Sequence, residues 1–324
     1  MHSLLKEIFS VTPTTFEEVT LRVFRYQYER IAIYRQYCDL LNRTAKNVQT
    51  IEDIPFLPIE FFKKHQILDG TLSAIAFTSS GTSGNTTSTH FVKDTTVYEQ
   101  SFINCFQKFY GPIREYAFFA LLPSYLEREG SSLIYMVNYM IKHGKPSSGF
   151  YLYNTEELLQ NISAALERKE KVILFGVSFA LLDLAEQHQF DFSEVTIIET
   201  GGMKGRKKEM IRSELHQILE QQLSTKNIHS EYGMTELLSQ AYSMGDERFH
   251  CPPWMKVLIR SHNDPFDYEK PEKTGGINII DLANLHSCSF IETQDLGKKH
   301  IDNSFEVLGR FDLSDIRGCN LLIN

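Results

Sequence analysis

Blocks of apolar and polar positions alternate through the middle of the chain, and they predict strands and helices in turn. Short apolar runs predict buried strands at residues 117–122, 171–175 and 195–200. Apolar residues at helical spacing predict helices at residues 95–110, 178–187 and 207–223, and one that opens at Asn154. Asn154 and Glu157 have the spacing of a capping box. Strands and helices that alternate in this way need crossover connections, so the fold class expected is α/β with a mostly parallel sheet.

The two ends of the chain have different patterns. Residues 1–50 carry Tyr, Phe, Leu and Arg at helical spacing and predict a helical lead-in of two or three helices. After residue 255 the helical pattern stops, and short strands are expected instead at 257–260, 276–281, 287–293 and 305–308. We therefore expect a small β-rich part at about 255–308, beside an α/β core with layered sheets.

Composition narrows the choice of partners and compartment. The chain has 324 residues, a net charge of -8 and a sequence pI near 5.8, which argue against a nucleic-acid partner. No apolar run is long enough to span a bilayer, and residues 1–9 read as an amphipathic helix, not a signal sequence. These features predict a cytoplasmic protein. Its five cysteines are scattered without a Cys-x-x-Cys pair, so we predict neither a disulfide framework nor a protein-held transition metal.

One polar stretch has the character of a phosphate-binding loop. Residues 78–84 read Thr-Ser-Ser-Gly-Thr-Ser-Gly, and the run continues through Thr89 without an apolar or charged side chain. Glycines and hydroxyls in such a run can direct several N–H and O–H groups toward one anion. The alternative is a flexible linker. The loop lacks the Gly-Lys-Ser/Thr ending of P-loop nucleotide hydrolases, so that class is not supported.

A second stretch, Tyr232 to Glu236, follows a predicted strand and offers an aromatic ring, a hydroxyl and a carboxylate. These groups suit a nucleotide base, a phosphate and Mg²⁺, respectively. The alternative is a helix start in which Thr235 is the cap and Tyr232 lies in the core.

Together these two stretches resemble the phosphate loop and the Tyr-Gly-x-Thr-Glu motif of the adenylate-forming superfamily of acyl-CoA synthetases. Gly201-Gly202 resembles the glycine pair beside the adenine, residues 293–297 the ribose-binding segment, and residues 309–312 the hinge of that superfamily. Within it, residues 54–63, 123–132 and 317–320 most resemble the acyl-protein synthetases, which supply fatty acyl groups to the reductase of bacterial luminescence.

The resemblance implies a set of roles. The β- and γ-phosphates of ATP would be held by the loop residues Thr78, Ser79, Ser80, Gly81, Thr82 and Gly84. Gly201, Gly202 and Tyr232 would contact the adenine, and Asp295 and Arg310 the ribose. Thr235 would donate to the α-phosphate and Glu236 would bind Mg²⁺. The implied reaction is ATP-dependent activation of a carboxylic acid, in particular a fatty acid, as acyl-adenylate, followed by transfer of the acyl group to a thiol.

The resemblance also sets the expected domain division and its main departures from the superfamily. Residues 1–308 would form the adenylate-forming N-terminal core, and residues 309–324 the hinge, with Asp312 as pivot, and a stub of a largely absent C-terminal domain. The lysine that this domain carries in the superfamily has no counterpart, so either its charge would come from a partner or from a core residue such as Lys204 or Lys207, or adenylation would be slow. The phosphate loop also lacks the lysine that many members carry.

Near the end of the chain, Cys319 stands beside Arg317 in the sequence. The acyl-protein synthetases carry an acyl thioester on a cysteine near the C-terminus, so Cys319 is the candidate nucleophile. A neighbouring cation favours the reactive thiolate. The alternative is a small apolar residue in a terminal strand. An acyl reductase or a carrier protein would be the acyl acceptor.

Two other functions fit parts of the sequence. Strand 171–175 followed by Gly176-Val177-Ser178 is close to the nucleophile elbow of serine hydrolases, with Asp281 and His286, or Asp295 and His300, as further members. That hypothesis leaves residues 78–84 and 232–236 unexplained. The absent C-terminal domain would also suit a non-catalytic, nucleotide-binding subunit of an acyl-transfer complex.

Overall fold

The computed structural model describes residues 2–79, 87–123, 130–201, 210–261 and 263–311. The chain divides into two compact units, one formed by Met1–Phe61 with Pro253–Asn324 and the other by Phe62–Pro252. We call them the terminal unit and the central unit and describe each by itself.

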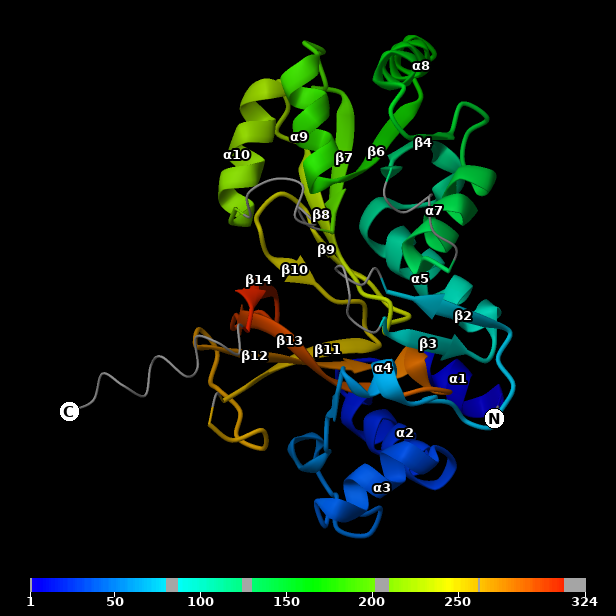
Figure 1. The fold of residues 1–324 in the computed structure, drawn as a ribbon, viewed down its shortest axis with the longest axis vertical. Helices are drawn as coiled ribbons and strands as arrows, with labels where there is room; N and C mark the ends of the chain where they lie inside the picture. The colour runs from blue at the N-terminus through cyan, green and yellow to red at the C-terminus, as the bar shows by residue number, and fades with distance from the viewer. Residues whose placement is uncertain (1, 80–86, 124–129, 202–209, 262, 312–324) are drawn as a thin grey trace, which may run out of the picture. The chain divides into compact units, whose positions relative to one another are not determined.

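The central unit is built on a mostly parallel sheet, as the alternating pattern predicts (Figure 1). Its strands lie in the order β10-β9-β8-β7-β6-β4-β5. The parallel part comprises β5 (Gly149–Tyr151), β4 (Tyr116–Leu121), β6 (Lys171–Val177), β7 (Val195–Thr200) and β8 (Ile228–Tyr232). The antiparallel strands β9 (Ala241–Ser243) and β10 (Phe249–His250) extend one edge. Strand β6 is buried from Val172 to Val177, which explains its continuous apolar sequence.

Helices cover both faces of this sheet (Figure 1). One face carries α5 (Thr95–Tyr110) and α7 (Ser132–His143), and the other carries α8 (Thr155–Glu167), α9 (Ser178–Gln187) and α10 (Arg212–Gln222). The capping box predicted at Asn154 is not formed, because its side chain donates to Glu157 and does not cap the helix. Helix α10 begins at Arg212, later than predicted, since Ile211 has extended backbone angles and is 66% exposed.

A two-stranded hairpin completes the central unit. Strands β2 (Ile75–Thr78) and β3 (Thr89–Val92) pair antiparallel and form a small sheet of their own. The short helix α4 (Phe61–Lys64) precedes them in the chain. The hairpin therefore joins the two ends of the hydroxyl-rich run.

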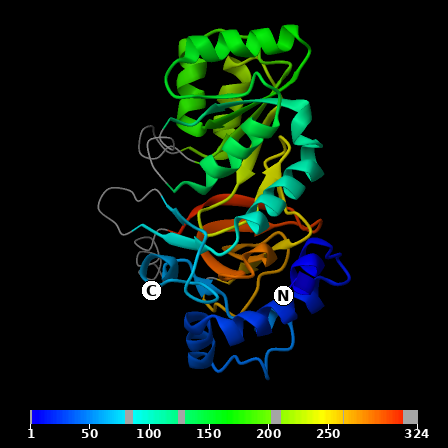
Figure 2. The same ribbon diagram turned by 90° about the vertical axis from the view of Figure 1, so that its right-hand side faces the viewer.

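The terminal unit combines the helical lead-in with the β-rich part. Strands β11 (Met255–Arg260), β12 (Thr274–Asp281), β13 (Phe290–Lys299) and β14 (Phe305–Arg310) pair antiparallel in that order, and β1 (Leu57–Pro58) pairs parallel with β13. The lead-in comprises α1 (His2–Phe9), α2 (Phe16–Arg30) and α3 (Ala32–Leu40), which lie along this sheet (Figure 2). Short 3-10 turns occur at η1 (Ile51–Asp53) and η3 (Leu282–Asn284) in this unit and at η2 (Ile113–Glu115) in the central unit.

Aromatic packing and one buried amide attach the lead-in to the sheet. Phe290 at the start of β13 lies 6.2 Å from the ring of Phe24 and 6.0 Å from that of Tyr34. Gln27, fully buried, donates to the carbonyl oxygens of Asn284 at 2.9 Å and Leu285 at 3.1 Å, and accepts from the N–H of Ser289 at 3.0 Å. Because this loop occupies residues 284–289, β13 begins at Phe290, not at the predicted residue 287.

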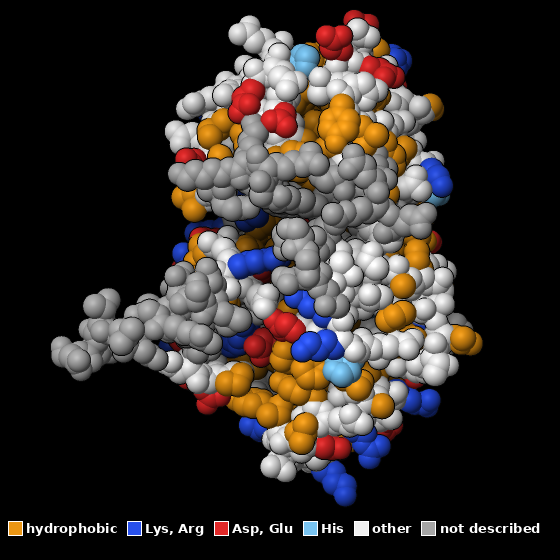
Figure 3. Space-filling view, in the orientation of Figure 1, with side chains coloured by type: hydrophobic (Ala, Val, Ile, Leu, Met, Phe, Trp, Pro, Cys, Tyr) orange, Lys and Arg blue, Asp and Glu red, His pale blue; other side chains and the backbone are white. Residues whose placement is uncertain are grey.

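Among the described helices, none has the length and apolar character needed to cross a membrane. On the face drawn in Figure 3, acidic and basic side chains are interspersed among apolar ones.

Candidate active site

The two ends of the hydroxyl-rich run are paired in the β2–β3 hairpin. Thr78 and Thr89 are paired, the N–H of Ser79 donates to the carbonyl oxygen of Ser88 at 3.0 Å, and the N–H of Ser88 donates to Oγ of Ser79 at 2.9 Å. Both strands belong to the central unit, so the run does not connect the two units of the chain. Of the predicted phosphate-binding residues, Ser80, Gly81, Thr82 and Gly84 lie outside the described residues.

Gly130 supports the start of this loop. Its carbonyl oxygen accepts a hydrogen bond from the N–H of Thr78 at 2.8 Å. Its φ angle is +82°, and a Cβ at this position would lie 2.9 Å from Oγ1 of Thr78. Glycine is therefore required both for the backbone conformation and for the close approach.

The Tyr232–Glu236 stretch is a turn at the end of β8. Tyr232 is the last residue of the strand, and its ring lies 5.7 Å from that of Phe249. No helix follows within the described residues 233–243, where the N–H of Leu237 closes a turn on the carbonyl oxygen of Met234 at 3.1 Å. The helix-start interpretation is therefore wrong. Tyr232 is 8% exposed and Glu236 is 4% exposed.

His90 joins the hairpin to this turn. Its Nδ1 atom lies 2.9 Å from the carbonyl oxygen of Thr235, and its ring packs edge-on against Phe62. A carbonyl oxygen only accepts, so Nδ1 carries the proton. Complete burial lowers the pKa of His90 to about 4, against the opposing effect of the bond to Thr235, so the ring is neutral at pH 7. Residues flanking the two sequence motifs are thus held together in one unit.

The end of β7 lies beside the same turn. Oγ1 of Thr200 donates to the carboxylate of Glu231, the residue before Tyr232. Burial raises the pKa of Glu231 to about 7, an effect that Thr200 opposes and the charge of Glu199 reinforces. Gly201 follows β7 with a φ angle of +78°, as a sharp turn requires, while Gly202 lies outside the described residues.

In the terminal unit, the two residues predicted to bind ribose lie opposite each other on β13 and β14. Asp295 and Arg310 are register partners, and Nε of Arg310 lies 3.4 Å from Oδ1 of Asp295. The Asp295 side chain is 11% exposed and that of Arg310 is 82% exposed. The N–H of Asp295 donates to Oγ1 of Thr293 at 3.1 Å. The carboxylate of Asp295 is therefore mostly buried on its strand, whereas the guanidinium of Arg310 is exposed to solvent.

Several other predicted residues lie outside the described part of the chain, namely Lys204, Lys207, Asp312 and Cys319. Among the described cysteines, Cys38, Cys105 and Cys288 are buried, and burial raises the pKa of Cys38 to about 12. A thiol with so high a pKa is a poor nucleophile at neutral pH.

The serine-hydrolase hypothesis finds no support in the geometry around Ser178. Its Oγ donates to Oε1 of Glu199 at 2.5 Å and lies 3.4 Å from the carbonyl oxygen of Gly201. Within the described residues, no histidine is hydrogen-bonded to the Ser178 hydroxyl. His300, one of the proposed triad members, is hydrogen-bonded to Glu272 and Glu306 instead. Ser178 therefore has a carboxylate acceptor but not the base that a nucleophilic serine needs.

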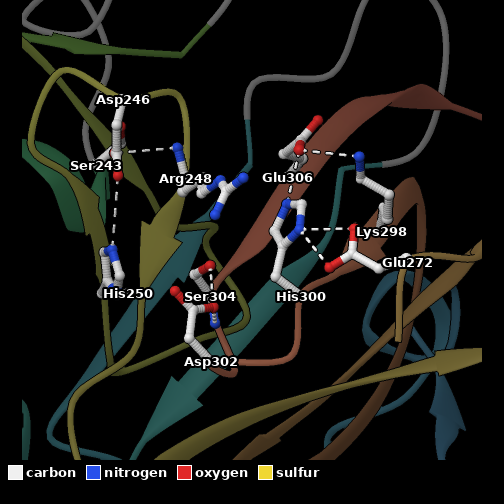
Figure 4. A network of polar contacts seen from close by, with 10 residues as sticks. All are labelled: Ser243, Asp246, Arg248, His250, Glu272, Lys298, His300, Asp302, Ser304 and Glu306. Carbon is white, nitrogen blue, oxygen red and sulfur yellow. Dashed lines mark hydrogen bonds and ion pairs between the residues drawn. The ribbon is translucent and has the colours of Figure 1, made fainter. Parts of the chain in front are cut away.

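Figure 4 shows the cluster around His300 in the terminal unit. Nδ1 of His300 lies 3.0 Å from both carboxylate oxygens of Glu272, and Nε2 lies 2.7 Å from Oε1 of Glu306. Nζ of Lys298 lies 3.1 Å from the same oxygen of Glu306. These contacts tie together the β13–β14 hairpin that carries Asp295 and Arg310. In the central unit, the same figure shows Asp246 with Ser243 and His250.

Sequence reasoning missed the supporting residues of the site. The sequence predicts no role for His90, although it directly follows the hydroxyl-rich run. Glu231 precedes the Tyr-Gly-x-Thr-Glu motif, and a charged residue at the end of a predicted buried strand was a signal that could have been used. Glu199, in an equivalent place on β7, gave the same signal.

Comparison with known proteins supplies the family context. Residues 12–109 match a family model described as acyl-protein synthetase, LuxE. The matched segment includes the helices of the lead-in and the whole β2–β3 hairpin. The chain is similar to the acyl-protein synthetases. This finding confirms the resemblance predicted from the sequence, whereas no curated protein gives a match.

Solved structures with the same fold are adenylate-forming ligases. A 2-hydroxyisobutyryl-CoA ligase in complex with 2-HIB-AMP and CoA superposes with a TM-score of 0.71 at 11% identity, over 95% of this chain and 78% of that one. ATP-bound MatB from Rhodopseudomonas palustris gives a TM-score of 0.55 at 13% identity, over 75% and 49%. The amide bond synthetase McbA from Marinactinospora thermotolerans gives 0.53 at 15%, over 76% and 52%.

These similarities confirm the predicted fold class, the α/β core of the adenylate-forming ligases. Identities of 11 to 15% establish a shared fold, and the acyl-protein synthetase match adds the family resemblance. Together they support the predicted enzyme class, a ligase.

Proposed function

We propose that this acyl-protein synthetase-like protein uses ATP to activate a carboxylic acid, most specifically a fatty acid, and transfers the acyl group to a protein thiol in the cytoplasm. The observation that carries the proposal is the hydrogen bond from His90 to Thr235. It holds the strand that leaves the hydroxyl-rich loop against the Tyr-Gly-x-Thr-Glu turn. Two motifs far apart in sequence, each suited to phosphate, are thereby held in one place.

The chemistry consists of two displacements. A carboxylate oxygen of the acid attacks the α-phosphorus of ATP, the bond from that phosphorus to the bridging oxygen breaks, and pyrophosphate leaves with the electron pair. A thiolate then attacks the acyl carbon of the acyl-adenylate, and AMP leaves. Thr78 and Ser79 begin the loop that would bind the β- and γ-phosphates, and the Thr235 hydroxyl would donate to the α-phosphate.

Glu236 suits a magnesium ligand by its chemistry. Its side chain is a carboxylate, the oxygen ligand that Mg²⁺ prefers, and it is 4% exposed. Within the described residues, no group of three or more His, Cys, Asp or Glu side chains is arranged to hold a metal. Glu236 would therefore share the ion with phosphate oxygens and water, as is usual for Mg²⁺ bound with a nucleotide. The ion would neutralise phosphate charge.

The remaining contacts to ATP would come from four residues. Tyr232 would lie against the adenine, and Gly201 would allow the backbone to approach it. Asp295 of the terminal unit would accept hydrogen bonds from the ribose hydroxyls, and Arg310 beside it would contribute a donor. A carboxylate held by its own strand can select a diol because both hydroxyls need an acceptor.

The decisive experiment measures pyrophosphate release from Mg-ATP by the purified protein across a panel of fatty and aryl acids, with hydroxylamine present to trap the adenylate. Release that depends on fatty acids is expected. Tight ATP binding without release for any acid would instead favour the nucleotide-binding subunit. Absence of both would refute the proposal.

The acyl-transfer step is tested with a Cys319→Ser variant and a radiolabelled fatty acid. The variant should still release pyrophosphate but should lose a hydroxylamine-sensitive acyl group on the protein. Cys251→Ser is the matched control, because Cys251 is a partly exposed thiol of the central unit. Persistent labelling of the Cys319→Ser protein would place the acyl group on another residue.

A further inference from the structure

A buried carboxylate in the central unit has no part in the proposed chemistry. Glu199 on β7 is 2% exposed, and its Oε1 accepts a hydrogen bond from Ser178 at 2.5 Å. Its Oε2 lies 3.7 Å from Nε of Arg212, and within the described part of the chain neither of these two atoms makes a hydrogen bond. A buried charge is costly unless it is paired, so Glu199 and Arg212 depend on each other.

Arg212 in turn lies on an aromatic ring. It is the first residue of α10, its side chain is 20% exposed, and its guanidinium carbon lies 4.6 Å from the centroid of the Phe249 ring. This is the geometry of a cation–π contact. The carboxylate of Glu199 therefore holds the cation, and the cation holds the ring of Phe249 from one side.

Phe249 passes this constraint on to Tyr232. The two ring centroids are 5.7 Å apart with an interplanar angle of 56°. Glu199 pairs with Ser230 on the neighbouring strand, and Tyr232 is two residues beyond Ser230, so Glu199 and Tyr232 belong to the same face of the sheet. A continuous series of contacts thus runs from the carboxylate of Glu199 through Arg212 and Phe249 to Tyr232. Tyr232 is the residue proposed to stack on the nucleotide base.

A purely stabilising ion pair explains this arrangement poorly. An ion pair stabilises a protein interior only when its geometry is good and its hydrogen bonds are made, and replacement of such pairs by apolar residues is often neutral. Here the closest approach is 3.7 Å and no hydrogen bond joins the two side chains. The contact that Arg212 makes well is the one with Phe249.

We propose that Glu199 and Arg212 are positioning residues for nucleotide binding, which act through Phe249 to fix the ring of Tyr232 against which the adenine stacks. The inference rests on the proposed function, since it assumes that ATP binds at Tyr232. Glu199 and Arg212 would then affect how tightly the base of ATP is bound, but not how tightly its phosphates are bound.

The test compares two ligands by calorimetry, ATP and inorganic tripolyphosphate, which has no base. Arg212→Met should weaken ATP binding about tenfold, in keeping with the size of base–aromatic stacking, and leave tripolyphosphate binding unchanged. Glu199→Gln should act in the same direction, and Arg212→Lys, which keeps the cation, should restore part of the affinity. Glu214→Gln, an exposed carboxylate in the first turn of the same helix, is the matched control and should bind ATP normally.

A double-mutant comparison shows whether Arg212 acts through Tyr232. In a Tyr232→Leu background, Arg212→Met should cause no further loss of ATP affinity, because the ring that it positions is gone. The same tenfold loss in both backgrounds, or an equal loss of ATP and tripolyphosphate, would overturn the inference. Failure of the wild-type protein to bind either ligand would refute the proposed function itself, a result distinct from wild-type binding that Arg212→Met leaves intact.

Discussion

Nδ1 of His90 donates a hydrogen bond to the carbonyl oxygen of Thr235 across 2.9 Å, although the two residues are 145 positions apart in the sequence. His90 is fully buried, so its ring cannot exchange this partner for water. The bond fixes the backbone of the turn at the residue whose hydroxyl is proposed to meet the α-phosphate. It also fixes β3, the strand that follows the hydroxyl-rich run.

Loss of this donor should lower activity. His90→Phe keeps an aromatic ring beside Phe62 but leaves the Thr235 carbonyl unpaired, a change that costs about 1–3 kcal/mol in a buried site. We expect kcat/KM for pyrophosphate release to fall at least about tenfold, which corresponds to 1.4 kcal/mol. His90→Asn, whose amide can place a donor near the position of Nδ1, should retain more activity. Equal activity of both variants would argue against a role for the bond.

Glu231 should make stability depend on pH. Its pKa is raised from 4.5 to about 7 in the folded state, so the neutral carboxyl suits the fold and the ionised one does not. Stability is then fully present below pH 4.5 and declines as the pH rises to about 7. Glu231→Gln removes this loss and should stabilise the protein at pH 8 by roughly 3 kcal/mol, with no gain at pH 4.5.

Urea unfolding of the wild-type and Glu231→Gln proteins between pH 4.5 and 8 gives this difference directly. The pKa values of His90, His216 and His229 are lowered to about 4, so both proteins should lose stability as the pH falls below 6.5. That common effect cancels when the two proteins are compared. A difference in unfolding free energy that is constant with pH would show that folding does not raise the pKa of Glu231.

Glu236→Gln should impair the use of Mg-ATP while the fold persists. The amide has nearly the same shape as the carboxylate but is a poor ligand for Mg²⁺. Pyrophosphate release should fall at least about tenfold, and the Mg²⁺ concentration for half-maximal activity should rise. Glu167→Gln changes the same charge at an exposed position at the end of α8 and serves as the control. An unchanged Mg²⁺ dependence in Glu236→Gln would exclude Glu236 as a ligand.

The ribose pair is tested by the choice between ATP and 2′,3′-dideoxy-ATP. The wild-type protein should prefer ATP, and Asp295→Asn should reduce that preference because the amide accepts fewer hydrogen bonds. Arg310→Ala should raise KM for ATP yet change the unfolding free energy by less than about 1 kcal/mol, since an 82% exposed side chain contributes little through its ion pair. If Asp295→Asn discriminates as the wild type does, the ribose lies elsewhere.

The sequence predicted helices and strands best where the local spacing of apolar residues alone determines the secondary structure. The helix at 95–110 has the predicted bounds, and the strand at 195–200 is observed as predicted, because their apolar spacing agrees with their burial. The prediction at Asn154 failed because a capping box depends on side-chain direction, which spacing does not determine. The predicted start of α10 was wrong because Ile211, an apolar residue in phase with the helix, remains exposed.

The residues that support the candidate site make contacts between segments far apart in the sequence, and no local pattern predicts such contacts. Arg212 meets Phe249, and Gln27 meets the loop at 284–289, only because strands and helices distant in sequence pack together. The resemblance to known ligases identified Asp295 and Arg310 separately, whereas their register across β13 and β14 follows from the hairpin itself. A single sequence can therefore indicate the residues proposed to bind ATP more readily than the residues that position their side chains.

The hydrogen bond between Thr78 and Gly130 has a mechanical consequence. Ser131, the next residue, caps α7 by accepting from the N–H of Ile134 at 3.3 Å, and the carbonyl oxygen of Ser132 accepts from Tyr98 at 3.0 Å. Gly130, which lacks a Cβ, allows both the +82° backbone angle and the close approach to Thr78 at this point. A ligand that draws Thr78 inward would therefore also pull on the first turn of α7, because Gly130 directly precedes the residue that caps this helix. The hairpin and the helix would move together.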